Sequence, residues 1–330
     1  MLFMPRLRQS RDVLEVEPPQ PPRRAVRQKV GLALGGGAAK GWAHIGVIKA
    51  LLDNGLVPDV VAGTSIGAVA GGCYAAGKLA ELEQFALSLT KRNVFAYMDL
   101  TLARRGLIAG GKLRDRFNAQ LSGCQIETLA TPFAAVATEI ETGHEVWTRK
   151  GDLVEAMRAS YALPGIFEPV GIGGRWLMDG AFVNPIPVTT ARALGADVVI
   201  AVNLNSDVFM RSSVIQSHGP DEAAAVPAPK AAGLFGPMLG IASMFRRGGG
   251  ETEQSPGIAT VMVDAFNIVQ DRIARSRLAG DPPDLMINPK LAGLGLMEFH
   301  RAREAIAIGE EAARRLMPEI RSCFASAAAG

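Results

Sequence analysis

Residues 60–72, Val-Val-Ala-Gly-Thr-Ser-Ile-Gly-Ala-Val-Ala-Gly-Gly, constrain the fold of this chain more than any other stretch. A short apolar run leads into the pentapeptide Gly63-Thr64-Ser65-Ile66-Gly67, and an Ala- and Gly-rich helical pattern follows it. G-x-S-x-G between a strand and a helix is typical of a nucleophile elbow, a tight turn that exposes a serine hydroxyl. Glycines at 63 and 67 would relieve the crowding of such a turn. The pentapeptide alone is a weak signal, because packing glycines around a serine that caps a helix produce the same pattern.

The elements around this turn predict an α/β protein. The short, mostly apolar run at 29–34 indicates a buried strand, and the Gly-rich turn 35–41 leads from it into a helix that ends near Asn54. Residues 59–62 form the second expected strand, and residues 65–76 its helix. This alternation of strands and helices predicts a largely parallel sheet.

The rest of the chain predicts further elements and a division into segments. Strands are expected at 132–140, 145–148, 175–178, 197–203 and 284–288, and helices at 79–90, 153–159, 258–278 and 298–316. We expect a disordered basic arm at 1–28, a core at 29–205, a flexible insertion at 206–256, elements that complete the same domain at 257–320, and a disordered tail at 321–330.

The insertion contains an apolar stretch that ends in two arginines, within residues 231–247. An amphipathic piece of this kind can lie on lipid or cover a site, so we expect peripheral membrane contact here. A short helix packed on the body of the protein fits the same residues.

Composition narrows the class of protein. A net charge of +3 is too near neutral to indicate a nucleic-acid partner. Cys73, Cys124 and Cys323 are odd in number and far apart, which favours a reducing compartment over a disulfide framework or a metal site. No apolar run reaches the ~18–20 residues of a membrane-spanning helix. We therefore expect a cytoplasmic protein that can be peripheral on the inner face of the membrane.

The Gly-rich loop, residues 35–41, is the candidate oxyanion hole for Ser65. Backbone amides without side chains can approach a developing negative charge closely, and a helix behind them adds its dipole. A phosphate-binding P-loop needs Gly before its Lys and Ser or Thr after it, but Ala39 and Gly41 flank Lys40. A dinucleotide-binding loop needs Gly where Lys40 stands.

The base that would activate Ser65 is less evident. None of the histidines, His44, His144, His218 and His300, stands where a catalytic triad would place it. Asp179 is the better partner, because a carboxylate in a partly apolar site can accept the proton of a serine hydroxyl. Asp-Gly is also a common turn signal, so a turn residue is the alternative.

Three motifs together resemble the patatin-like phospholipase family, in particular its compact bacterial branch. They are Gly35-Gly-Gly-Ala-Ala-Lys-Gly-Trp-Ala-His-Ile-Gly46, Gly63-Thr-Ser-Ile-Gly67 and Asp179-Gly180-Ala181, in the order and spacing of that family. Residues 159–169 are similar to the segment that lines the active site in that branch. The likeness covers residues 30–205 and returns more weakly over 258–309. Asp-Gly-Ala stands where many members have Asp-Gly-Gly, and the last glycine of the loop comes one residue later than in plant patatins.

The resemblance implies a three-layer α/β/α fold and a Ser-Asp dyad that needs no histidine, metal or cofactor. Carried over by position, Ser65 is the nucleophile, Asp179 the base, and Gly35, Gly36, Gly37 and Ala38 the oxyanion loop. Gly63, Gly67 and Gly180 complete the motifs. The implied activity is hydrolysis of lipid acyl esters, as in a phospholipase, lysophospholipase or esterase.

Two alternatives remain open at this point. One is a hydrolase of short-chain or storage-polyester esters, and the other is a membrane-associated regulatory protein with little turnover. The apolar residues 163–167 suit an acyl chain and suit core packing equally well.

Overall fold

The computed structural model describes residues 27–97, 111–206 and 258–328. In this part of the chain, eight strands form one sheet in the order β5-β6-β3-β2-β1-β7-β8, with β4 paired to β3 beside that path. The strands are β1 (Val30–Leu34), β2 (Val60–Thr64), β3 (Phe133–Glu139), β4 (Glu145–Thr148), β5 (Val170–Ile172), β6 (Arg175–Asp179), β7 (Val198–Val202) and β8 (Leu285–Ile287). Neighbours from β3 to β8 along this path are parallel, whereas β4, β5 and β6 pair antiparallel. The predicted α/β class with a mostly parallel sheet is confirmed.

Helices connect the strands and cover the sheet. The α-helices are α1 (Ala43–Asp53), α2 (Ile66–Ala75), α3 (Leu79–Ser88), α4 (Lys91–Tyr97), α5 (Gly111–Leu121), α6 (Leu153–Tyr161), α7 (Val188–Ala193), α9 (Ile258–Gly280) and α10 (Ala302–Ala328). Short 3-10 helices are η1 (Ala38–Trp42), η2 (Ile126–Thr128), η3 (Gly180–Phe182) and η4 (Phe299–Arg301). None of these described helices is long and apolar enough to cross a bilayer.

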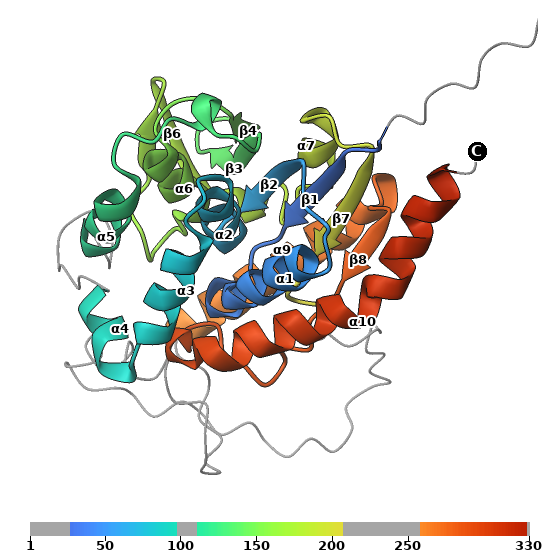
Figure 1. Ribbon diagram of the computed structural model, residues 1–330. Coiled ribbons are helices and arrows are strands. Elements are labelled where there is room, and N and C mark those ends of the chain that lie inside the picture. Colours follow the sequence, from blue (N-terminus) through green and yellow to red (C-terminus); the bar gives the residue numbers. More distant parts are fainter. Residues whose placement is uncertain (1–26, 98–110, 207–257, 329–330) are drawn as a thin grey trace, which may run out of the picture.

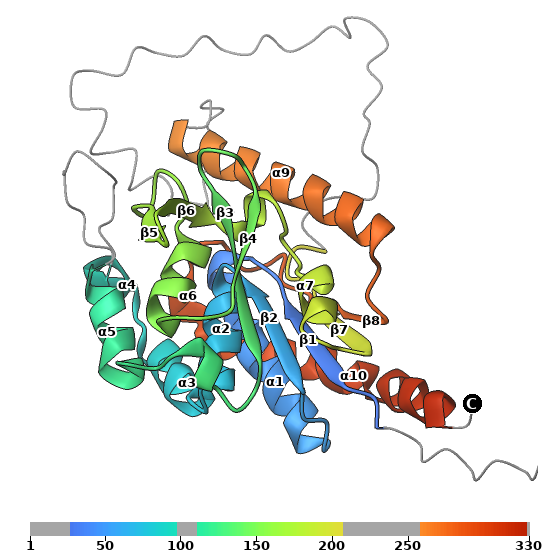
Figure 2. The ribbon, with the colours of Figure 1, turned by 90° about the horizontal axis from the view of Figure 1, so that it is seen from above.

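The sheet lies between two helical layers, as its alternating side chains require. In β1, Leu32 and Leu34 belong to the large core that includes residues of α1, α2 and α10. Ala33, between them, packs on the opposite face with Val188 of α7 and Ala274 of α9. Figure 2 shows α9 on one side of the sheet and the neighbouring pair α1 and α10 on the other. The arrangement is the expected three-layer α/β/α fold.

Strand register brings the sequence motifs to one place. The Gly-rich loop follows β1, and Ser65 follows β2, so both lie at the carboxyl edge of neighbouring parallel strands. Thr64 pairs with Val136 of β3, and the next β3 residue, Ala137, pairs with Asp179 at the end of β6. Ser65 and Asp179 are therefore 114 residues apart in the chain, with β3, β4 and β5 between Ser65 and the strand that ends at Asp179, yet they lie together in space.

The C-terminal helix differs from prediction. The sequence pattern predicts a helix that ends near 316 and a disordered tail at 321–330, whereas α10 continues to Ala328. Ile320 is fully buried and Arg321 donates a hydrogen bond to Asn54 Oδ1 at 3.0 Å, so contacts with the body of the protein extend the helix past Pro318. The structure also contains α4, α5, β5 and α7, which the sequence pattern did not indicate.

Two predicted segments lie outside the described residues. They are the basic arm, apart from its last two residues, and nearly all of the insertion at 206–256, including the apolar stretch within 231–247.

Candidate active site

Ser65 occupies the strained turn that the pentapeptide predicts. It is one of two described non-glycine residues with positive φ, at φ 55° and ψ −125°. A side chain at Gly67 would overlap the Leu34 carbonyl oxygen, and one at Gly63 would overlap the Gly67 carbonyl oxygen. Both motif glycines are therefore required because backbone segments approach each other closely here.

Asp179 lies directly against the serine. The Ser65 hydroxyl donates a hydrogen bond to Asp179 Oδ2 at 2.7 Å, and the Ala181 N–H donates to Asp179 Oδ1 at 2.8 Å. The Asp179 backbone is fixed as well, because its N–H donates to Ala162 O at 3.0 Å and Thr138 Oγ1 donates to its carbonyl at 2.8 Å. A side chain at Gly180 would overlap the Val136 carbonyl oxygen, so the Asp-Gly pair is more than a turn signal.

The electrostatic state of Asp179 suits a base. Its side chain is buried, and burial raises its pKa from 3.8 to about 7, with the Ala181 N–H and the Ser65 hydroxyl acting to lower it. A carboxyl with this pKa is ionised in part at neutral pH and can also take up a proton there. General base catalysis needs both properties.

The backbone of Ser65 is held by a second serine. The Ser65 N–H donates to Ser160 Oγ at 2.9 Å, and the Ser160 hydroxyl donates to the Val136 carbonyl at 2.5 Å. Ser160 is fully buried at the end of α6. It thus joins the nucleophile turn to β3 and to the segment 161–167 that begins directly after it.

The Gly-rich loop offers fewer free amides than predicted. The Gly35 N–H donates to Val202 O at 3.1 Å and the Gly36 N–H donates to Pro185 O at 3.0 Å. Because these two N–H groups already have acceptors within the protein, the structure favours the next two amides of the predicted loop as donors to an oxyanion. Within the described residues, the N–H groups of Gly37 and Ala38 have no protein acceptor, and both residues line the cavity that contains Ser65. These two amides are the candidate hole.

His44 of α1 contacts the Gly-rich loop through a hydrogen bond to its first residue. It is fully buried, burial lowers its pKa to about 4, and its Nε2 lies 2.8 Å from the Gly35 carbonyl oxygen. A neutral imidazole therefore donates its Nε2 hydrogen to Gly35. His44 therefore has a structural role beneath the loop. None of the described histidines lines the cavity with Ser65.

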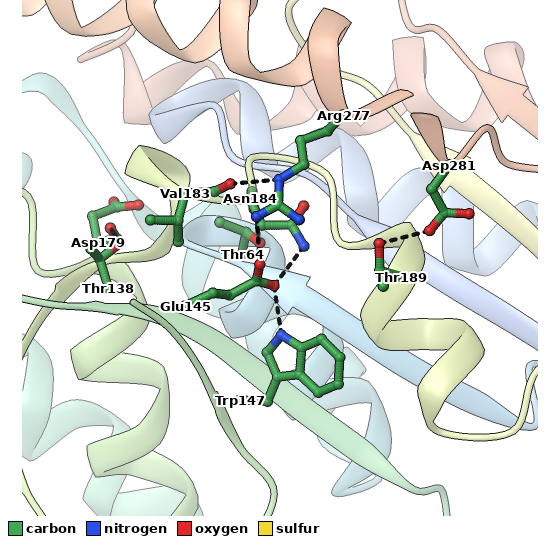
Figure 3. A network of polar contacts seen from close by, with 10 residues as sticks. All are labelled: Thr64, Thr138, Glu145, Trp147, Asp179, Val183, Asn184, Thr189, Arg277 and Asp281. Atoms are coloured by element: carbon green, nitrogen blue, oxygen red, sulfur yellow. Dashed lines mark hydrogen bonds and ion pairs between the residues drawn. The ribbon is translucent and has the colours of Figure 1, made fainter. Parts of the chain in front are cut away.

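A polar network anchors the chain that follows Asp179 (Figure 3). Glu145 Oε1 accepts hydrogen bonds from Trp147 Nε1 at 2.5 Å and from Asn184 Nδ2 at 2.7 Å, and Glu145 Oε2 pairs with Arg277 at 2.7 Å. The Asn184 carbonyl in turn accepts from Thr64 Oγ1 at 2.8 Å. The network joins α9 and β4 to the residue immediately before Ser65.

A mostly apolar cavity of about 160 Å³ opens beside Ser65 and Asp179. Its walls come from α2, α3, α4, α5, the 161–167 segment, α9 and the region of η4. The apolar and aromatic wall residues include Trp42, Ile66, Val69, Phe85, Leu89, Leu113, Phe117, Leu163, Phe167, Phe266, Leu296 and Phe299. Residues 163–167 therefore border the site, although whether they contact an acyl chain stays a prediction.

A family model described as Patatin-like phospholipase matches residues 32–192. An uncharacterized NTE family protein from Mycobacterium bovis is 33% identical over 328 residues, which cover 88% of this chain and 91% of the relative. The chain belongs to the patatin-like phospholipase family. The family predicted from the three sequence motifs is thus confirmed.

Two further relatives are much longer proteins, and this chain matches only a small share of their length. Lysophospholipase nte1 from Emericella nidulans is 34% identical over 56% of this chain and 12% of its own length. The patatin-like phospholipase domain-containing protein 6 of Mus musculus is 35% identical over 54% of this chain and 14% of its own length. A solved structure of VipD from Legionella pneumophila matches with a TM-score of 0.42 and 14% identity over 89% of this chain and 67% of VipD, a similarity too low to add to the fold description.

Sequence reasoning missed Ser160, the supporting network and Gln270 of α9, which lines the same cavity as Ser65. Ser160 directly precedes Tyr161-Ala-Leu-Pro164, where the sequence predicts the end of a helix. Its place at this helix end is the one sequence feature that could have marked it. Gln270 lies in a helix far along the chain and outside the matched residues, where nothing local marks it.

Proposed function

We propose that this chain is a serine acyl hydrolase of lipid esters, with Ser65 as nucleophile and Asp179 as base. The observation that carries the proposal is the 2.7 Å hydrogen bond from Ser65 Oγ to Asp179, in the wall of an apolar cavity beside the free amides of Gly37 and Ala38. Nucleophile, base, oxyanion donors and an apolar binding space thereby meet at one point. The names of the nte1 relatives favour a lysophospholipid as substrate.

The reaction follows from this geometry in two steps. Asp179 takes the Ser65 proton while Oγ attacks the ester carbonyl, and the amides of Gly37 and Ala38 hold the negative charge of the tetrahedral intermediate. The carbon–oxygen bond to the alcohol breaks, and the alkoxide leaves with the proton from Asp179. Water then attacks the acyl-enzyme with Asp179 again as base, and release of the fatty acid restores the Ser65 hydroxyl.

Hydrolysis of a p-nitrophenyl ester series and of lysophospholipid by wild type, Ser65→Ala and Asp179→Asn tests the proposal. We expect the wild type to turn over and to label with a fluorophosphonate, and both variants to fall by a factor of about 10³ or more. Asp179→Asn keeps the shape of the side chain, so unfolding temperatures separate lost chemistry from lost structure. A wild type that neither hydrolyses nor labels would exclude an active serine and favour a regulatory protein.

A further inference from the structure

Gln270 of α9 is a buried polar residue at the candidate active site. The residue is 4% exposed and lines the same cavity as Ser65 and Asp179. It comes from the C-terminal part of the chain, beyond the residues that the family model matches.

One hydrogen bond orients the Gln270 amide. Asn205 Nδ2 donates to Gln270 Oε1 at 3.4 Å, which assigns the oxygen to the side that faces the end of β7. The Nε2 group therefore faces the Gly-rich loop. Within the described residues, no protein acceptor is found for Nε2, and this donor is open to the cavity that Gln270 lines, where an atom of a bound substrate can accept its hydrogen.

Gln270 Nε2 and the Ser65 side chain lie beside the same residue of the Gly-rich loop. A methyl group placed on Gly36 would lie 3.5 Å from Gln270 Nε2, 3.5 Å from the Ser65 Cβ and 3.7 Å from the Ala181 Cβ. Gln270 Nε2 and the Ser65 Cβ thus border the same space beside Gly36. The residues directly after Gly36 are Gly37 and Ala38, which carry the two free amides.

We propose that Gln270 is a catalytic residue whose Nε2 hydrogen is a third donor to the oxyanion, beside the N–H groups of Gly37 and Ala38. The inference rests on the proposed function. A neutral amide donates at any pH and adds no charge next to Asp179. The donor serves the tetrahedral intermediate more than the ester, because the charge on the oxygen develops only as the reaction proceeds.

Gln270→Leu and Gln270→Glu test this role on p-nitrophenyl esters, with Gln84→Leu on the exposed side of α3 as the control for the same chemical change. We expect Gln270→Leu to lower kcat about 10²-fold with KM little changed, since loss of one oxyanion donor typically costs 10²–10³ in kcat. Gln270→Glu keeps the length but places a carboxylate toward the oxyanion, so its kcat should fall at least as far. The rate of fluorophosphonate labelling should fall in parallel, and Gln84→Leu should match the wild type.

Three results would overturn the inference. They are an unchanged kcat in Gln270→Leu, a rise in KM alone, and full activity in Gln270→Glu, which would mean that the side chain only fills space. A wild type that is active and loses turnover with Ser65→Ala, but is insensitive at position 270, would reject Gln270 and leave the proposed function intact. A wild type with neither hydrolysis nor labelling would reject both.

Discussion

At the scale of single residues, the candidate site depends on groups that are each held by two or more neighbours. Asp179 has both carboxylate oxygens and both backbone polar groups engaged. Ser65 keeps a strained backbone because Ser160 accepts its N–H. Such over-determined positions are what a preorganised active site requires.

The pKa of Asp179 predicts a pH dependence of activity. Because burial raises this pKa to about 7 and the base must be ionised, kcat/KM should fall as pH drops through about 7. A pH–rate profile of the wild type on a neutral ester measures this. A midpoint near the ordinary carboxyl value of 3.8 would contradict it.

The raised pKa of Asp179 also predicts that stability decreases with rising pH, whereas activity increases. Between about pH 4 and about pH 7, folded Asp179 retains a proton that the unfolded chain has lost, so this group makes the free energy of unfolding decrease as pH rises. Asp179→Asn removes the titration. Its unfolding temperature relative to wild type should therefore rise across this window and stay level above it, and a constant difference would count against the shift.

Ser160→Ala should reduce activity more than stability. The substitution leaves the Ser65 N–H without an acceptor and the Val136 carbonyl without a donor, at a cost of about 1–3 kcal/mol of unfolding free energy. Because the elbow is no longer held, we expect kcat to fall about tenfold or more with KM nearly unchanged. Ser122→Ala, on the surface, is the control. A stability loss with wild-type kcat would make Ser160 a purely structural residue.

At the scale of elements, two glycines allow helices α1 and α10 to pack closely against each other. A side chain at Gly46 of α1 would overlap the Ile306 carbonyl oxygen of α10, and one at Gly309 of α10 would overlap the Ala43 carbonyl oxygen of α1. Figure 1 shows these two helices side by side along the front of the molecule. Their spacing is thus set by the absence of side chains at the crossing.

Alanine at either glycine should separate the helices. We expect Gly46→Ala and Gly309→Ala each to lower the free energy of unfolding by about 1–3 kcal/mol, as overpacked positions do. The double variant should cost less than the sum, because one displacement of the helices relieves both overlaps. Urea unfolding measures this, and Gly280→Ala, where a side chain meets open space, should be neutral. An additive double variant would argue against a shared crossing.

At the scale of the whole molecule, the site is assembled from both ends of the described chain. The loop after β1, the elbow after β2 and the end of β6 carry the residues of the proposed reaction, while α9, which begins at Ile258, closes one wall of the cavity and carries Gln270. Arg277 ties α9 to Glu145 and to the Val183 carbonyl, so this helix and the Asp179 segment are held together (Figure 3).

The apolar stretch within 231–247 predicts that the protein hydrolyses esters in vesicles and soluble esters with different dependence on this stretch. We propose that it contacts the membrane surface, since its apolar residues are followed by two arginines. Deletion of residues 234–245 should then weaken hydrolysis of esters in vesicles more than hydrolysis of soluble esters. Equal loss on both would indicate a structural role. A deletion from the basic arm, residues 6–16, provides a control of similar length.

Local patterns in the sequence determined much of this protein. The strand–loop–helix order, the elbow at Ser65, the Gly-rich loop and the Asp179-Gly180 pair each depend on residues adjacent in the chain, so apolar runs and glycines suffice to mark them. The family and the α/β/α fold followed from their combination.

Only the tertiary structure decided which groups complete the site. Ser160 lies 95 residues from Ser65, and Gln270 lies 65 residues from the Asn205 that orients it, so no local pattern records these contacts. The same holds for the loop amides: Gly35 and Gly36 are occupied by acceptors from β7 and Pro185, which leaves Gly37 and Ala38 free. The sequence shows that a backbone N–H is present but not whether it has an acceptor. Tertiary packing determines whether an acceptor lies within hydrogen-bond distance.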